Sequence, residues 1–244
     1  MYQVISGKKY ITFSFDDGTT QDIRLVELLN KYNIKATFNI NSQLLGMSGE
    51  VIREGKSIPH DKVPADSVRS IYQGHEIAAH TLTHPLLTAL EDKEIVRQVE
   101  QDRLYLSELA GYEVLGMAYP CGGINYDKRV ANLVKTQTGI RYSRTIECNE
   151  AFAPQTDLYT FHPTVHHNSW NAMEKLSEQF FNTQSDNPQI FYIWGHSFEF
   201  DVQNTWNRFE NFLKQIANKP DVVYATNRDV LLNNINDESR TISH

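Results

Sequence analysis

Segments typical of strands and of helices alternate along almost the whole chain, and this alternation constrains the fold more than any other feature. The strand-like runs are short and rich in β-branched and aromatic residues. Seven are present, over residues 10–15, 36–40, 76–79, 114–119, 140–144, 190–194 and 222–225. Between them the sequence predicts helices over residues 21–32, 65–71, 91–110, 127–136, 169–181, 205–217 and 227–233. Parallel strands joined by crossover helices produce this order, so we predict an α/β protein with a barrel rather than a wide open sheet.

The chain is long enough for one large hydrophobic core. Its 244 residues show neither a shift in composition nor an internal repeat that would mark a domain boundary. The most linker-like stretch, residues 47–64, is predicted to be an insertion between two strands. We therefore expect a single catalytic domain over residues 1–244.

Charge and cysteine content exclude several classes of protein. The formal net charge of −7 argues against general binding of nucleic acid or anionic lipid, and it disfavours a strongly acidic polymer as substrate. The two cysteines, Cys121 and Cys148, cannot form a disulfide framework, and we expect both to be unpaired. Neither a membrane span nor a signal peptide is recognisable. We expect a cytoplasmic protein as the sequence stands, or an exported one if a leader has been removed.

Polar groups follow four of the predicted strands directly. The segments are Asp16-Asp17-Gly18 after the first strand, His80-Thr81-Leu82-Thr83-His84 after the third, Tyr119-Pro120-Cys121-Gly122 after the fourth and Gly195-His196 after the sixth. In parallel α/β barrels, the loops at the carboxyl ends of the strands carry the functional groups. We therefore expect these segments to meet at one mouth of the barrel.

The residue types in these segments indicate a metal site. Asp16 and Asp17 would repel each other at the end of an apolar strand unless a cation or hydrogen-bond donors compensated them. His80 and His84 are four residues apart, and two histidines with one carboxylate leave coordination positions open for water and substrate. Taken separately, packed histidines and a turn or helix cap explain these residues better. Their conjunction at strand ends favours a hydrolytic metal site.

Four ordered motifs resemble those of the polysaccharide deacetylases, carbohydrate esterase family 4. They are SFDDG at 14–18, GHEIAAHTLTH at 74–84, YPCGG at 119–123 and IWGH at 193–196, and the resemblance covers about residues 10–230. It implies a distorted, incomplete (β/α) barrel with about seven parallel strands. It also implies a divalent metal ion, often zinc, and hydrolysis of N-acetyl or sometimes O-acetyl groups on sugars. Cobalt, nickel, manganese and iron also suit histidine and carboxylate ligands.

Carried over by position, the resemblance assigns a role to each motif residue. Asp16 would be the general base, and the metal ligands would be Asp17, His80 and His84. His196 would be the general acid that protonates the leaving amine, and the backbone N–H of Cys121 would stabilise the oxyanion. A nucleophilic Cys121 thiol is the rival interpretation, which a metal-dependent hydrolase does not need.

The chain departs from the family pattern in the third motif. Many members have an arginine where this chain has Ala118, and a common tyrosine is replaced by Cys121. Arg144, at the end of the fifth predicted strand, is a candidate to supply the missing cation to the catalytic carboxylate. A surface or structural arginine is the alternative.

The family's fourth motif has no clear counterpart in this sequence. Side chains that could line a sugar cleft, or equally well be packed or exposed, are Tyr159, His162, His166, His167 and Trp170. Glu199 is a candidate to orient the imidazole of His196, although a solvated loop acid is the favoured interpretation.

We therefore expect a metal-dependent hydrolase that removes N-acetyl groups, or O-acetyl groups as a second option, from a saccharide or cell-wall-type glycan. Two alternatives remain open. One is a hydrolase of a ureide or cyclic amide on the same barrel. The other is a carbohydrate-binding protein that keeps the metal site but is catalytically inactive.

Overall fold

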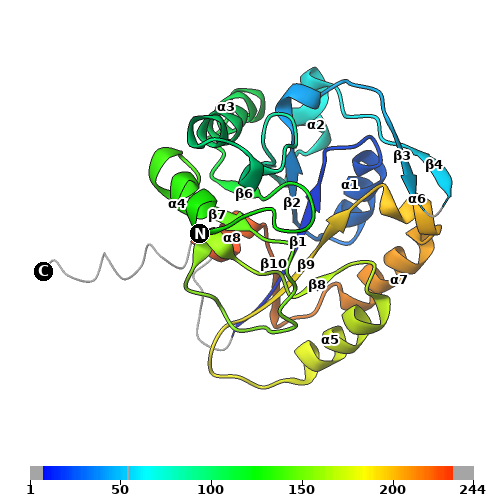
Figure 1. Ribbon diagram of the computed structural model, residues 1–244. Helices are drawn as coiled ribbons and strands as arrows, with labels where there is room; N and C mark the ends of the chain where they lie inside the picture. Colours follow the sequence, from blue (N-terminus) through cyan, green and yellow to red (C-terminus); the bar gives the residue numbers. More distant parts are fainter. Residues whose placement is uncertain (1–7, 54, 233–244) are drawn as a thin grey trace, which may run out of the picture.

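The computed structural model describes residues 8–53 and 55–232, and its centre is a curled sheet of parallel strands (Figure 1). The strand order is β7-β6-β5-β2-β1-β9-β8, and β10 pairs with β1 beside this path. The strands are β1 (Lys9–Asp16), β2 (Ala36–Ile40), β5 (Glu76–Ala79), β6 (Gly116–Ala118), β7 (Tyr142–Arg144), β8 (Val165–His166), β9 (Gln189–His196) and β10 (Val222–Tyr224). The predicted incomplete barrel and all seven predicted strands are confirmed. The two-residue strand β8 was not predicted, because it is too short to give a pattern.

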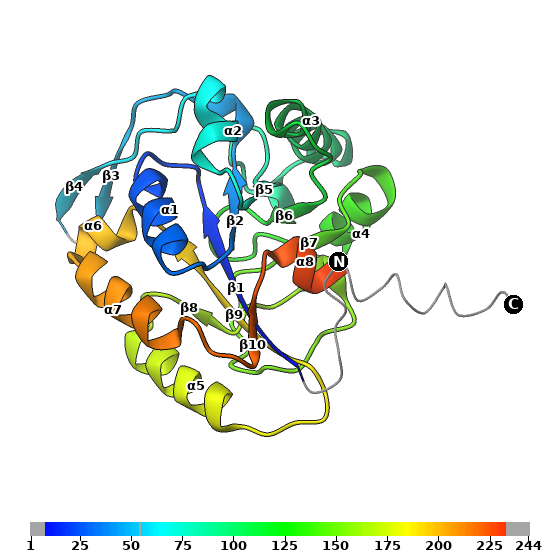
Figure 2. The same cartoon turned by 180° about the vertical axis from the view of Figure 1, so that it is seen from behind.

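Helices surround this sheet in both views (Figures 1 and 2). They are α1 (Asp22–Lys31), α2 (Val68–Ile71), α3 (Asp92–Ala110), α4 (Lys128–Gln137), α5 (Trp170–Asn182), α6 (Glu199–Gln203), α7 (Trp206–Ile216) and α8 (Asn227–Leu232). Short 3₁₀ helices cover Ser42–Leu44, Ala65–Ser67, Leu87–Ala89 and Leu158–Thr160. All predicted helices are found, residue 233 of the last lying outside the described residues, whereas α6 was missed. Within the described part of the chain, no helix has both the length and the apolar character needed to cross a membrane.

The predicted insertion contains an antiparallel hairpin of β3 (Glu50–Arg53) and β4 (Lys56–Pro59). The hairpin lies beside α6 in both views, and Lys56 Nζ donates a hydrogen bond to the carbonyl of Val202 at 2.9 Å (Figures 1 and 2). The chain then returns to the loop that follows β1, where Lys62 and Thr19 form an antiparallel bridge. This return segment, residues 60–63, lies next to the carboxyl end of β1.

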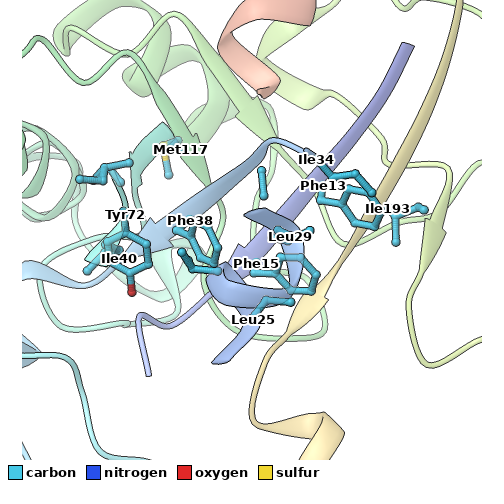
Figure 3. Close-up of a cluster of buried hydrophobic side chains, with 14 of the residues drawn as sticks. Phe13, Phe15, Leu25, Leu29, Ile34, Phe38, Ile40, Tyr72, Met117 and Ile193 are labelled. Carbon is cyan, nitrogen blue, oxygen red and sulfur yellow. The ribbon is translucent and has the colours of Figure 1, made fainter. Parts of the chain in front are cut away.

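The core holds the central strands against α1. Phe13 and Phe15 of β1 and Phe38 of β2 are fully buried, and Figure 3 shows them beside Leu25 and Leu29 of α1. Burying a phenylalanine or leucine side chain contributes about 1.5–3 kcal/mol to stability. The face of β1 that carries Phe13 and Phe15 is therefore packed firmly into the core.

Candidate active site

An open cavity of about 490 Å³ lies at the carboxyl ends of the strands. Its lining includes the predicted site residues Asp16, Asp17, His80, His84, Cys121 and His196. The parallel register explains the meeting of two of them, because Asp16 on β1 is the partner of His196 on β9. The four strand ends singled out in the sequence therefore meet at one mouth, as predicted.

Arg144 compensates the charge of Asp16. Its guanidinium is fully buried and donates from Nη2 to the Asp16 carboxylate, while Asn39 Nδ2 donates to the other carboxylate oxygen at 2.7 Å. Burial alone would raise the pKa of Asp16, but the charges of Arg144 and of the nearby imidazoles outweigh it and lower this pKa below its usual value. Arg144 is the register partner of Ala118 on the neighbouring strand, so it enters the site from beside the position where many family members have their arginine.

Asp17, His80 and His84 form a set of donors that suits a divalent metal ion. Their ligand atoms lie within 4.8 Å of one another. Asp17 Oδ1 is 3.5 Å from His84 Nε2 and 3.9 Å from His80 Nε2. Nδ1 of His80 lies 2.8 Å from the carbonyl of Ala118, and a proton on Nδ1 would leave Nε2 free to coordinate. Burial lowers the pKa of His80 to about 4, so the imidazole is neutral, which is the form that binds metal.

The backbone around this set adopts conformations that are rare for residues with side chains. Asp17, Thr81, His84 and Cys121 have positive φ angles of 83°, 70°, 59° and 69°. Each such residue costs on the order of 1–3 kcal/mol and persists only where its surroundings hold it. Asp102 of α3, which the sequence did not single out, holds the His80 end by accepting its backbone N–H at 2.9 Å. The fold thus keeps these polar groups directed into the cavity against local preference.

Cys121 contacts His84 through both its backbone N–H and its sulfur. Its N–H donates a long hydrogen bond of 3.5 Å to His84 Nε2, and its Sγ lies 3.7 Å from His84 Nδ1. Burial and the charge of Asp17 raise the pKa of the Cys121 thiol, so the thiolate that a nucleophile requires is disfavoured at neutral pH. Both cysteines are free, as expected.

The carboxylate of Glu199 lies close to three histidine rings. Its Oε2 lies 2.8 Å from His167 Nε2, 3.3 Å from His196 Nδ1 and 3.4 Å from His166 Nε2. Burial would lower the pKa of His196, but Glu199, together with the carboxylates of Asp17 and Asp16, raises it to about 9. His196 is therefore an imidazolium at neutral pH. The favoured expectation of a solvated loop acid is wrong for Glu199, because α6 turns its carboxylate toward these rings.

His166, His196 and Glu199 also lie close enough together to be considered as metal ligands. However, Nδ1 of His166 accepts a hydrogen bond from the backbone N–H of Asn168 at 3.2 Å. In the neutral ring this places the proton on Nε2, which faces Glu199. This cluster is therefore better described as a carboxylate with imidazole donors than as a second metal site.

The other candidates for a sugar cleft have packing roles in the described structure. The Tyr159 hydroxyl donates to the carbonyl of Ile140 at 3.2 Å, and His162 Nδ1 lies 2.8 Å from the Thr145 hydroxyl. Trp170 is covered by the guanidinium of Arg208 at 4.6 Å. None of the three is among the described lining residues of the cavity.

Two residues that the sequence did not indicate, His60 and Lys62, contact Asp17. His60 Nε2 lies 3.2 Å from Asp17 Oδ2, and Lys62 Nζ donates to the Asp17 carbonyl at 2.8 Å. Burial alone would raise the pKa of Asp17. The His60 hydrogen bond and the charges of Lys62 and nearby histidines outweigh this effect and hold the pKa well below its usual value. Both residues come from the return segment of the insertion, whose path cannot be read from a local pattern.

The amino-acid sequence of the chain matches those of known proteins. The family model for polysaccharide deacetylases matches residues 3–143, more than half of the chain. The chain is 31% identical over 126 residues to the peptidoglycan-N-acetylmuramic acid deacetylase PdaC of Bacillus subtilis strain 168, covering 50% of this chain and 23% of PdaC. It is 30% identical over 125 residues to the peptidoglycan-N-acetylglucosamine deacetylase PgdA of Listeria monocytogenes, again covering 50% of this chain and 23% of the relative. The matches thus span about a quarter of the length of these relatives.

The fold also resembles that of a solved structure. The Xyl-CE4 domain of a multidomain xylanase from the hindgut metagenome of Trinervitermes trinervoides matches with a TM-score of 0.55 at 18% identity, covering 92% of this chain and 90% of that domain. On the family match and this shared fold, the chain belongs to the polysaccharide deacetylase family.

Proposed function

We propose that this chain is a metal-dependent hydrolase that removes N-acetyl groups from a saccharide of the cell-wall type. The observation that carries the proposal is that Asp16 and His196 are register partners on neighbouring strands. The donor set of Asp17, His80 and His84 lies beside them. The names of PdaC and PgdA support N-acetylated sugars of peptidoglycan as the substrate class. O-acetyl groups are the second substrate option.

The proposed base is Asp16. A divalent ion on Asp17, His80 and His84, with zinc the first choice, would act as a Lewis acid on the acetyl carbonyl and lower the pKa of a water molecule. The carboxylate of Asp16 accepts the proton of the attacking water, because Arg144 and Asn39 keep it ionised and fix its direction. The oxygen of that water then forms the new bond to the acetyl carbon.

Cys121 is the proposed oxyanion donor and His196 is the proposed acid, and both line the cavity. In the structure the N–H of Cys121 donates to His84 Nε2; with that nitrogen bound to the metal ion, the N–H would be free to donate to the carbonyl oxygen as negative charge develops on it. His196 gives its proton to the sugar nitrogen as the carbon–nitrogen bond breaks, leaving acetate and a free amine. Glu199 keeps His196 charged until that step.

Release of acetate tests the proposal. The full chain, loaded with Zn²⁺, is incubated with N-acetylglucosamine oligomers and with peptidoglycan, and acetate is quantified with and without a chelator. We expect release that the chelator stops and that returning Zn²⁺, Co²⁺, Ni²⁺, Mn²⁺ or Fe²⁺ restores to differing degrees. Glycan binding without acetate release would instead support an inactive binding protein. Turnover of a cyclic amide or ureide alone would support the other alternative.

The Asp16→Asn variant tests the mechanism separately from the substrate. Removing the proposed base should lower kcat by about 10²–10⁴-fold, the usual contribution of general base catalysis. Metal binding should persist, because Asp17, His80 and His84 are unchanged. Unchanged acetate release by this variant would contradict the assigned mechanism even if the substrate is right.

A further inference from the structure

The two carboxylate oxygens of Asp17 have different neighbours. Oδ1 lies 3.5 Å from His84 Nε2, 3.9 Å from His80 Nε2 and 3.8 Å from Lys62 Nζ. Oδ2 lies 3.2 Å from His60 Nε2. A carboxylate turns easily about its terminal torsion, so something must decide which oxygen faces a metal ion.

We propose that His60 is a positioning residue that holds Oδ2 of Asp17 and so keeps Oδ1 directed at the metal, an inference that rests on the metal site of the proposed function. Carboxylate ligands in metal sites are themselves hydrogen-bonded, and such partners fix the direction of the ligand. The donor here comes from an insertion far along the chain, rather than from the strand ends that carry the ligands.

The return segment gives His60 a fixed place. The backbone N–H of Val63 donates to the carbonyl of Gly18 at 3.0 Å, and Thr20 donates to the carbonyl of Asp61 at 2.8 Å. These bonds attach the insertion to the loop that contains Asp17. The ring of His60 also packs edge-to-face on Phe198, with 4.8 Å between ring centroids. Its position is therefore set by backbone pairing on one side and by an aromatic contact on the other.

The same segment supports the backbone of Asp17. Lys62 Nζ donates to the Asp17 carbonyl at 2.8 Å, and Asp17 has the unfavourable φ of 83°. Lys62 is buried, so this donor has few alternative positions. One short segment thus holds both the main chain and the outer carboxylate oxygen of the same ligand.

Zn²⁺ affinity of the full chain tests this inference without relying on activity. In His60→Phe the aromatic contact with Phe198 is retained but the donor to Oδ2 is lost. We expect its dissociation constant for Zn²⁺ to rise by about 10–100-fold, the usual effect of removing such a partner. In His60→Gln the side-chain amide places a donor near the position of Nε2, and we expect most of the affinity to return. Ile52→Ala, at an exposed position on the hairpin of the same insertion, is the matched control and should bind Zn²⁺ like the wild type.

The outcomes separate the inference from the proposed function. Equal Zn²⁺ affinity of His60→Phe and the wild type would overturn the inference, even if the wild type deacetylates glycans. Equal weakening in the Phe and Gln variants would also overturn it, because the hydrogen bond would not be the cause. The expected order of affinities with no acetate release from any glycan would support the inference and contradict the proposed function. A wild-type chain that binds no Zn²⁺ would contradict both.

Discussion

The largest compensation of the Asp16 charge comes from one guanidinium. Arg144 is fully buried, donates to the Asp16 carboxylate and stacks on the Trp194 ring at 4.4 Å. Removing one partner of a buried ion pair leaves an uncompensated charge, which costs about 3–5 kcal/mol. We expect Arg144→Met to lose stability of this order, to raise the pKa of Asp16 and to lower kcat more than tenfold.

Urea unfolding and the pH dependence of kcat measure the effect of Arg144→Met. Arg141→Met, which changes an exposed arginine just before the same strand, is the control and should behave like the wild type. If Arg144→Met keeps wild-type turnover and pH dependence, Arg144 does not replace the family's arginine.

The alkaline limit of activity should follow the His196 imidazolium. Its pKa is raised to about 9, so activity should persist at neutral pH and fall as the pH rises through about 9, where the proton is lost. The ionisable groups close to His196 are Glu199 on α6, His166 and His167 at the end of β8, Asp16 at the end of β1 and Asp17 directly after it.

Replacing Glu199 by Gln removes the carboxylate that contributes most to that upward shift, so burial should then lower the pKa of His196. We expect the alkaline limb of kcat in Glu199→Gln to move to lower pH, measured between pH 5 and about 10. Glu178→Gln, on the exposed face of α5, should leave the profile unchanged. An alkaline limb at the same pH in both variants would mean that another group sets it.

The end of β9 has room for glycine alone. A Cβ at Gly195 would lie 1.8 Å from Cδ2 of His167, and the φ of +155° is unfavourable for any other residue. We expect Gly195→Ala to lose about 1–3 kcal/mol of unfolding free energy, as overpacked sites do, and to lower kcat by displacing His196. Gly122→Ala, where a Cβ meets nothing within 4 Å, is the control in urea unfolding. Equal stability of the two variants would contradict this account.

The elements that the sequence predicted are those with long regular patterns. Apolar strands such as β1 and amphipathic helices such as α3 were found close to their predicted bounds. In contrast, β8 has two residues and α6 has five, which is too few for a periodic signal. The hairpin of β3 and β4 was predicted only as an insertion, because its strands are largely exposed and lack a clear alternating pattern.

The residues of the candidate site also divide into those that the sequence predicted and those that it did not. Asp16, Asp17 and His80 were predictable because each follows directly after an apolar strand. The contact of His60 with Asp17 was not predictable, because it depends on where an insertion returns in space. Glu199 was weighed as a partner of His196 but assigned to solvent, since nothing in the sequence shows that α6 turns it inward.

At the scale of the whole molecule, the order of the strands explains how a few residues form the proposed site. β1 lies between β2 and β9, and the register places Asn39, Asp16 and His196 in one row across the three strands. The proposed base therefore has a hydrogen-bond donor on one side and the proposed acid on the other. Parallel strands end at the same edge, so the loops that contain the metal donors lie above this row.

This architecture predicts how metal affects the stability of the whole chain. The described hydrophobic core is built from apolar side chains and not from the proposed metal ligands, so the metal-free protein should stay folded, with an unchanged far-UV circular dichroism spectrum after chelation. Zn²⁺ at about 100 times its dissociation constant should add about 2.7 kcal/mol, because it binds the folded state. For a chain of this size that corresponds to a rise in Tm of about 5–11 °C.

Thermal unfolding with and without Zn²⁺ measures this rise, and two histidine variants locate its source. His84→Ala removes a proposed ligand and should lose most of the Tm increase. His162→Ala is the matched control, because His162 has the same spacing to His166 that His80 has to His84 but contacts Thr145 instead of the donor set. It should keep the full increase. A Tm increase of equal size in both variants would place the stabilising ion elsewhere and contradict the assigned ligands.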